Sequence, residues 1–103
     1  MPLHLETHEI RVFRTVYEES GFNKAAEKLF VTQSAVSQTI ANLEHKLDTV
    51  LFHRKPLKLT EAGMRLLQYA DTVLSEEETV LADLNNIKTV SYTHLTLPTK
   101  RIV

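Results

Sequence analysis

The chain has 103 residues, no cysteine and a formal net charge of −1, with 43% hydrophobic and 24% charged residues. This length allows one small domain, or one domain with an appendage, and is too short for a sizeable enzyme cleft. Without cysteine there is neither a disulfide framework nor a thiolate zinc site. No apolar run has the length of a membrane span or of a signal-peptide core, so the sequence predicts a soluble cytoplasmic protein.

Charge is distributed unevenly along the chain. Residues 1–22 carry two basic and four acidic side chains, residues 23–60 carry six basic and three acidic, and residues 61–88 carry two basic and six acidic. The excess of positive charge is therefore confined to the middle of the chain, as a nucleic-acid-binding surface requires. We expect the acidic segment to face away from a polyanionic partner.

The N-terminal segment predicts one helix, over residues 5–19, that supplies part of the core. Its apolar residues recur at helical spacing, and Phe13 is among them. Gly21 follows the helix and is expected in the left-handed conformation that many helix ends need. His4 and His8 lie four residues apart, but no third ligand accompanies them. We therefore predict a surface pair and no metal site.

Residues 22–47 contain two short helices separated by a tight turn, and the rest of the chain is organised around them. The first helix runs from about Asn23 to Phe30, with Asn23 placed as its N-cap and small alanines that allow another helix to approach closely. Thr32 is the expected N-cap of the second helix, over residues 33–47. The apolar stripe of the second helix, with steps of four, three and four, consists of Val36, Ile40, Leu43 and Leu47.

The opposite face of the second helix is polar but almost uncharged. Amide and hydroxyl side chains suit hydrogen bonding to base edges in the major groove of DNA, which admits one α-helix. One interpretation is a helix-turn-helix, whose second helix reads bases with its N-terminal residues. The other is a polar face on an ordinary helical hairpin, although such a face would usually carry paired charges. The face comprises Gln33, Ser34, Ser37, Gln38, Ala41, Asn42 and His45.

Two short β-prone pieces follow, over residues 50–54 and 57–60, and Lys55-Pro56 lies between them. This arrangement predicts a tight two-stranded wing. Arg54, Lys55 and Lys58 form a cluster of cations on the projecting turn, which suits DNA phosphates or a minor groove. Without a neighbouring DNA-binding motif, we would interpret the cluster as part of an ordinary basic loop exposed to solvent. Beside a helix-turn-helix, it favours a contact with the DNA backbone.

Residues 60–88 predict one long helix, with Thr60 as its N-cap. Gly63 is unfavourable inside a helix, and a close crossing of another helix would explain it. The apolar residues alternate steps of four and three, which gives a heptad seam that a small domain cannot bury alone. We predict dimerisation through this seam, and the alternative is a helix folded back on its own domain. Glu77 interrupts the seam and either fixes its register or faces solvent. The predicted dimerisation residues are Leu66, Ala70, Val73, Leu74, Val80, Leu81, Leu84 and Ile87.

The last segment, residues 89–103, differs abruptly in composition from the helix before it. Its sequence, TVSYTHLTLPTKRIV, is rich in β-branched residues and has no helical period. It resembles translated adapter or vector sequence, so we expect a non-native or disordered tail. A short natural strand or peptide is the alternative.

Several ordered blocks together carry a family resemblance. AAEKLFVTQSAVSQTIANLEHKL, followed by LFHR and LTEAG, resembles the N-terminal DNA-binding domain of LysR-type transcriptional regulators, over roughly residues 5–87. The resemblance implies a mainly α fold, with a winged helix-turn-helix of three helices and a short two-stranded wing over residues 1–59. A long linker helix follows over residues 60–88. Many relatives have proline where Ser34 stands and arginine where Gln38 stands, so we expect an altered target sequence.

The resemblance also implies a function, that of a sequence-specific transcription regulator. Such a protein binds double-stranded DNA as a homodimer whose linker helices pair antiparallel, and it needs no cofactor. The large effector-binding domain of the family is absent from this sequence, so a small-molecule effector concerns only a full-length parent. Gln33, Ser34, Ser37 and Gln38 are the expected base-reading residues. The expected contacts to the DNA backbone are Asn23, Lys24, Thr32, Arg54, Lys55 and Lys58.

Two other classes of function remain as alternatives. One is a helical dimerisation or protein-interaction module without specific DNA binding, which would show no salt-dependent affinity for DNA. The other is an enzyme, for which the sequence offers no catalytic residues, because it has no glycine-rich phosphate loop and no HExxH motif. A regulator of this kind is expected in the bacterial cytoplasm, associated with the nucleoid.

Overall fold

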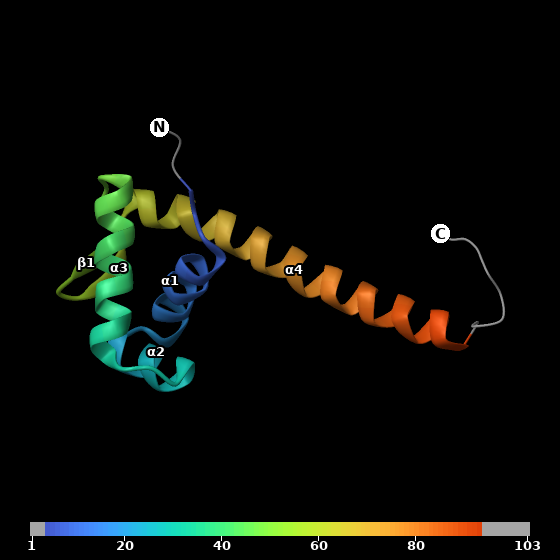
Figure 1. The fold of residues 1–103 in the computed structure, drawn as a ribbon. Helices are drawn as coiled ribbons and strands as arrows, with labels where there is room; N and C mark the ends of the chain where they lie inside the picture. The colour runs from blue at the N-terminus through green and yellow to red at the C-terminus, as the bar shows by residue number, and fades with distance from the viewer. Residues whose placement is uncertain (1–3, 94–103) are drawn as a thin grey trace.

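The computed structural model describes residues 4–93, with side chains described for residues 4–88. The described residues form four helices and one two-stranded antiparallel sheet. This is the predicted winged helix-turn-helix followed by a long helix, so the mainly α fold class is confirmed (Figure 1). In chain order the elements are α1 (Thr7–Glu19), α2 (Phe22–Leu29), α3 (Gln33–Leu47), β1 (Phe52–Arg54), β2 (Leu57–Leu59) and α4 (Glu61–Thr93).

The core lies where the three short helices, the wing and the first half of α4 meet. Phe13 on α1 is fully buried, as predicted, and its ring centroid lies 5.3 Å from that of Phe52 on β1. The ring of Phe22 packs edge-on against Phe52, with 6.2 Å between centroids. Aromatic pairs at these separations stabilise beyond their buried area. Phe52 therefore anchors the wing to the helical core.

The three short helices all end on a residue in the left-handed region, namely Ser20, Phe30 and Asp48. The prediction for Gly21 was wrong, because Ser20 takes the left-handed conformation and Gly21 is extended, with φ of 175°. The chain consequently turns one residue earlier than expected, and Gly21 becomes the N-cap of α2. The predicted N-cap role of Asn23 was wrong for the same reason, since α2 already begins at Phe22.

The other predicted N-caps are confirmed. The hydroxyl of Thr32 accepts the backbone N–H of Ala35 at 3.1 Å, which satisfies one of the unpaired donors at the start of α3. Thr60 does the same for α4, where its hydroxyl accepts the backbone N–H of Gly63 at 2.9 Å. The same hydroxyl donates to the carbonyl of Val50 at 2.7 Å. The start of α4 is thereby fixed to the segment that leads into the wing.

Gly63 allows a close approach of backbone, although not of the kind predicted. A Cβ at this position would collide with the carbonyl oxygen of Leu51 and would lie 2.9 Å from a methyl carbon of Leu59. The crossing chain is therefore the segment entering β1, and the expectation of a crossing helix was wrong. The sequence pattern indicates that position 63 requires a small residue. Which segment of the chain packs against it can be seen only in the tertiary structure.

Gly63→Ala is expected to lower the free energy of unfolding by about 1–3 kcal/mol, because the added methyl group forces the backbone at Leu51 to move. Urea denaturation followed by helical circular dichroism measures this change. Gly21→Ala is the matched control, since a Cβ there would meet nothing within 4 Å and Gly21 is extended. Equal stability of the two variants would contradict the close packing at Gly63.

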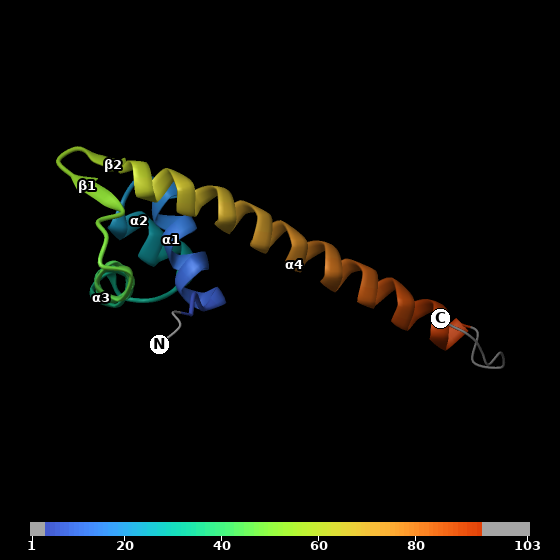
Figure 2. The same ribbon diagram turned by 90° about the horizontal axis from the view of Figure 1, so that it is seen from above.

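The long helix α4 packs on the domain only over its first half and then projects beyond it (Figure 2). Side chains of residues 78–88 are all exposed. The helix runs to Thr93, past the predicted end at residue 88, because β-branched residues lower helix propensity only slightly and an existing helix propagates readily. Residues 94–103 of the predicted tail lie outside the described residues. Within the described range, no helix is both long and apolar enough to cross a membrane.

Candidate nucleic-acid interface

The polar face of α3 lies on the outside of the domain. Val36, Ile40 and Leu43 are buried in the core, which turns the opposite side of the helix outward. Of the predicted base-reading residues, Gln33, Ser34 and Gln38 are exposed and Ser37 is half-buried. The structure therefore brings all four onto one side of the same helix, near its N-terminus.

Two side-chain hydrogen bonds order this face. The Gln33 amide donates to the Ser37 hydroxyl at 3.4 Å, and the Gln38 amide donates to the Asn42 carbonyl oxygen at 2.9 Å. Both bonds join residues four apart, which are neighbours on a helix surface. Side chains that are already restrained lose less conformational entropy on binding. The side-chain amides of Gln33 and Gln38 are thus restrained before any ligand binds, instead of being distributed over many rotamers.

Further polar groups are exposed at the starts of α2 and α3. Asn23 and Lys24 on α2 are exposed, and so is Thr32, the N-cap of α3. The first turn of α3 contains no acidic residue. The unpaired N–H groups and the helix dipole at such an N-terminus favour an anion such as phosphate.

The wing places basic side chains beside this helix. Its two strands pair Phe52 with Leu59, His53 with Lys58, and Arg54 with Leu57. Phe52 is buried, whereas His53, Arg54, Lys55 and Lys58 are all exposed. Phe52 and Arg54 lie on one face of β1, and His53 lies on the other. Arg54, Lys55 and Lys58 all remain exposed, where they can meet a polyanion.

Glu44, near the end of α3, is a residue that the sequence analysis missed. Its side chain is only 15% exposed and is paired with the guanidinium of Arg54, whose Nη2 lies 3.0 Å from a Glu44 oxygen. The other Glu44 oxygen accepts the backbone N–H groups of Leu51 at 2.7 Å and of Phe52 at 3.3 Å. The Arg54 guanidinium also lies 5.0 Å from the ring centroid of Phe22. Glu44 thus joins α3 to the wing and orients Arg54.

A second ion pair joins the end of α3 to the start of α1. Lys46 Nζ lies 2.6 Å from a carboxylate oxygen of Glu9. Burial alone would raise the pKa of Glu9, but the hydrogen bond from Lys46, the backbone N–H of Glu6 and the charges of Lys46 and His8 together hold that pKa below its ordinary value. The carboxylate therefore stays ionised and keeps α3 in place against α1.

Comparison with known proteins identifies the family. Residues 7–64 match the family described as "Bacterial regulatory helix-turn-helix protein, lysR family". The chain belongs to this family. The LysR-type resemblance carried by the sequence blocks is therefore confirmed, and the family is one of transcription regulators and not of enzymes. Family membership does not favour the alternative of an interaction module without DNA binding.

Solved structures and curated relatives agree with this assignment to the LysR family. The BenM_DBD/catB site 1 DNA complex matches with a TM-score of 0.77 and 36% identity, over 82% of this chain and 96% of that chain. Full-length LysG from Corynebacterium glutamicum matches with a TM-score of 0.76 and 32% identity, over 81% of this chain and 29% of that one.

Two curated relatives show the same pattern of coverage. The probable RuBisCO transcriptional regulator of Cyanophora paradoxa is 42% identical, over 85% of this chain and 28% of its own length. The HTH-type transcriptional regulator YofA of Bacillus subtilis is 37% identical, over 88% of this chain and 37% of its own length. The chain therefore spans less than two-fifths of either relative.

In this LysR-family chain, the two halves of the predicted seam of α4 lie in different environments. Leu66, Ala70 and Leu74 are buried in the core of the chain itself, so the first half of the seam is folded back on its own domain. Val73 is half-buried. The remaining residues of the predicted dimerisation set are exposed, and these are Val80, Leu81, Leu84 and Ile87.

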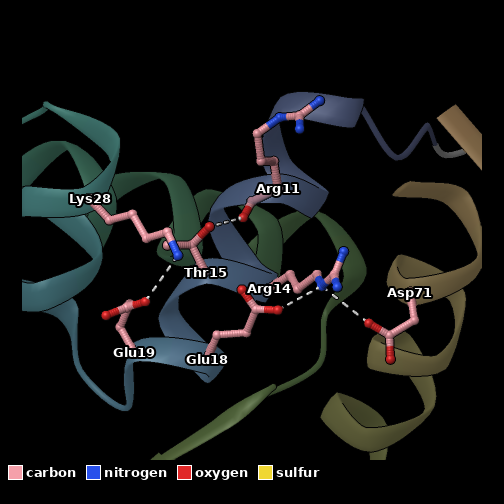
Figure 3. A network of polar contacts seen from close by, with 7 residues as sticks. All are labelled: Arg11, Arg14, Thr15, Glu18, Glu19, Lys28 and Asp71. Atoms are coloured by element: carbon pink, nitrogen blue, oxygen red, sulfur yellow. Dashed lines mark hydrogen bonds and ion pairs between the residues drawn. The ribbon is translucent and has the colours of Figure 1, made fainter. Parts of the chain in front are cut away.

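Ion pairs surround α1 and connect it to its neighbours (Figure 3). Arg14 Nε lies 3.1 Å from Glu18 on the same helix and 3.2 Å from Asp71 on α4. Lys28 on α2 pairs with Glu19 at 3.4 Å. These contacts tie α2 and α4 to α1, the helix on which the domain is assembled.

Proposed function

We propose that this chain is the DNA-binding part of a transcription regulator, which reads double-stranded DNA with α3 and contacts the backbone with the wing. The observation that carries this proposal is the exposed, uncharged polar face of α3 together with the exposed basic residues Arg54, Lys55 and Lys58 of the wing. Further support comes from the likeness to BenM_DBD, which was solved in complex with DNA. We place such a protein in the bacterial cytoplasm, associated with the nucleoid.

Base recognition is assigned to the N-terminal half of α3. Gln33, Ser34, Ser37 and Gln38 would face base edges in the major groove, and a bidentate contact of glutamine with adenine is worth about 1–3 kcal/mol of discrimination. The two hydrogen bonds on this face support the assignment, because they leave each glutamine ordered at the surface.

Backbone contacts are assigned to residues on both sides of α3. A guanidinium has five N–H donors, so Arg54 can keep its bond to Glu44 and still donate to a phosphate. The N-cap of α3 is suited to phosphate through its exposed backbone N–H groups. The proposed backbone contacts are Asn23, Lys24, Thr32, Arg54, Lys55 and Lys58.

Dimerisation is assigned to α4. The exposed stripe of Val80, Leu81, Leu84 and Ile87 supports this proposal, because a second copy of the helix would cover it. Leu66, Ala70, Val73 and Leu74 belong to the same seam, and they act by holding the first half of the helix on the domain. Two recognition helices joined in this way would occupy half-sites about 34 Å, or a multiple of that distance, apart. A small-molecule effector would act only in a longer parent protein.

The division of labour between α3 and the wing gives a test. Gln33→Ala is expected to relax the base preference at one position, by about 1–3 kcal/mol, in a selection from random duplexes. Arg54→Ala is expected to weaken binding to all duplexes and to reduce the slope of log K against log salt by about 1.

Lys88→Ala is the matched control for charge, because Lys88 is an exposed cation far along α4. It should change neither the preference nor the slope. An equal loss on every sequence for both Gln33→Ala and Arg54→Ala would contradict the assignment. Absence of any DNA binding at low salt would overturn the proposed function.

A further inference from the structure

The direction in which α4 leaves the domain is fixed by contacts with α1. Ala70 is fully buried and Leu74 is 4% exposed, so this part of the helix packs tightly. Three residues beyond Leu74, Glu77 continues the same stripe and pairs with Arg11 on α1, with 2.8 Å between Oε1 and Nη2. Within the described side chains, all residues from 78 to 88 are exposed. The pair of Arg11 with Glu77 therefore stands at the outer end of the packed part of α4.

A second ion pair acts nearer to the base of the helix. Arg14 is held between Glu18 on its own helix and Asp71 on α4, at 3.1 and 3.2 Å (Figure 3). The same Nε atom contacts both carboxylates, so Arg14 links α1 to α4. Arg11 and Arg14 are three residues apart and so lie on one face of α1. Together they hold α4 at two points along its length.

Residues 78–93 form a projecting arm that magnifies any change in this direction. The arm is about 24 Å long at about 1.5 Å per residue. A tilt of about 10° at its base moves its end by about 4 Å, which is close to the ~3.4 Å rise of one base pair. If two chains join through their arms, a small tilt changes the separation of the recognition helices by about one base pair in each subunit.

We infer that Arg11 and Arg14 determine the half-site spacing of the operator, because their ion pairs with Glu77 and Asp71 set the angle of the projecting arm. Neither arginine belongs to the proposed DNA-binding surface, so both are positioning residues. The inference rests on the proposed DNA-binding homodimer joined through α4. The side chains that set spacing are thus separate from those that read bases.

The angle of the arm can be measured directly in the whole chain. The sequence has no cysteine, so Glu27→Cys on α2 and Asp83→Cys on the arm introduce two unique sites for spin labels. Dilution into an excess of unlabelled protein leaves only distances within one chain. We expect Arg11→Glu to shift or broaden the distance distribution, because it places like charges at the pair with Glu77. The exchange Arg11→Glu with Glu77→Arg should restore the original distribution.

A matched control separates the ion pair from the general charge of the arm. Arg11→Glu with Glu78→Arg has the same composition as the exchange, but residue 78 is exposed and adjoins the seam position instead of occupying it. This variant is expected to remain shifted. Restoration by both exchanges, or an unchanged distribution in Arg11→Glu, would overturn the inference.

The consequence for DNA is tested on duplexes that carry two identical half-sites, separated in steps of one base pair. Wild-type protein is expected to prefer one spacing by at least tenfold. Arg11→Glu should move that optimum by at least one base pair or reduce the preference at least threefold, and the exchange should restore it. Affinity for a single half-site should remain within twofold in all variants. A dimeric Arg11→Glu variant with unaltered spacing preference would overturn the inference.

Failure of the proposed function gives different results. A wild-type chain that binds single half-sites but sediments as a monomer would overturn the dimer and the spacing role together. A wild-type chain that binds no duplex would overturn DNA binding itself. In either case the spin-label distances still report whether the ion pair of Arg11 with Glu77 sets the arm.

Discussion

Phe13→Ala is expected to lower the free energy of unfolding by about 3–5 kcal/mol, which is a large share of the 5–15 kcal/mol typical of small domains. Phe13 is fully buried, and its ring packs against Phe52 of the wing. The surroundings could not easily fill the cavity left by the ring, because Phe52 is held by its pairing with Leu59 on β2 and by the ring of Phe22. The unfolding midpoint in urea should therefore fall sharply.

Two variants on the same helix give the controls. Tyr17→Ala removes an aromatic ring of similar size, but Tyr17 is 45% exposed, so we expect a loss well below that of Phe13→Ala. Phe13→Leu keeps most of the buried volume and should remain folded at a cost of about 1–2 kcal/mol. Similar losses for Phe13→Ala and Tyr17→Ala would show that Phe13 is not central to the core.

The buried faces of the helices were predictable from the sequence, whereas the helix ends were only partly so. Val36, Ile40 and Leu43 lie on one face of α3, because residues three and four apart on a helix share a face. This face is apolar, and it is buried. The end of α1 depends on which residue takes the left-handed conformation. Ser20 takes it in place of Gly21, which is extended and serves as the N-cap of α2.

The seam of α4 shows a further limit of sequence patterns. Its spacing indicates which residues share a face, but not what covers that face. Leu66, Ala70 and Leu74 pack in the core of the chain, while Val80 and Leu84 on the same helix are exposed. The difference arises because only the first half of α4 packs against the domain, whereas the side chains of residues 78–88 are exposed. A repeat of seven residues does not indicate which neighbour, if any, covers each part of the face.

The candidate site, too, could be predicted from the sequence only in part. The amides of α3 were recognisable by type and position, since a polar face without charge is unusual on a solvated helix. The role of Glu44 was not recognisable, because its partners are backbone N–H groups seven and eight residues away, across a turn. Only the folded chain brings the carboxylate, these donors and Arg54 together.

Glu44→Ala is expected to lower the free energy of unfolding by about 2–4 kcal/mol. The change removes the acceptor of the N–H groups of Leu51 and Phe52, two residues that are almost fully buried, and each orphaned donor costs about 1–3 kcal/mol. Loss of the ion pair with Arg54 adds little, because the arginine side chain is 46% exposed and water can replace the carboxylate. Urea denaturation at constant pH measures the sum.

The same variant should weaken DNA binding without changing base preference. Glu44 fixes the strand that carries Arg54, so its removal lets the basic wing move away from the position in which it meets the backbone alongside α3. We expect a loss of about tenfold in affinity, or about 1.4 kcal/mol, on every duplex at a temperature where the variant remains folded. Fluorescence anisotropy on matched and scrambled duplexes would measure both losses.

Glu44→Gln separates the two roles of this carboxylate. A glutamine carbonyl can still accept the N–H of Leu51, so we expect most of the stability to be retained. Its amide cannot balance the charge of Arg54, which gains freedom to contact phosphate. The slope of log K against log salt should then become steeper by up to about 1, whereas Glu44→Ala should not steepen it. If both variants bind DNA like the wild type, the wing acts independently of α3, and the carboxylate contributes only to folding.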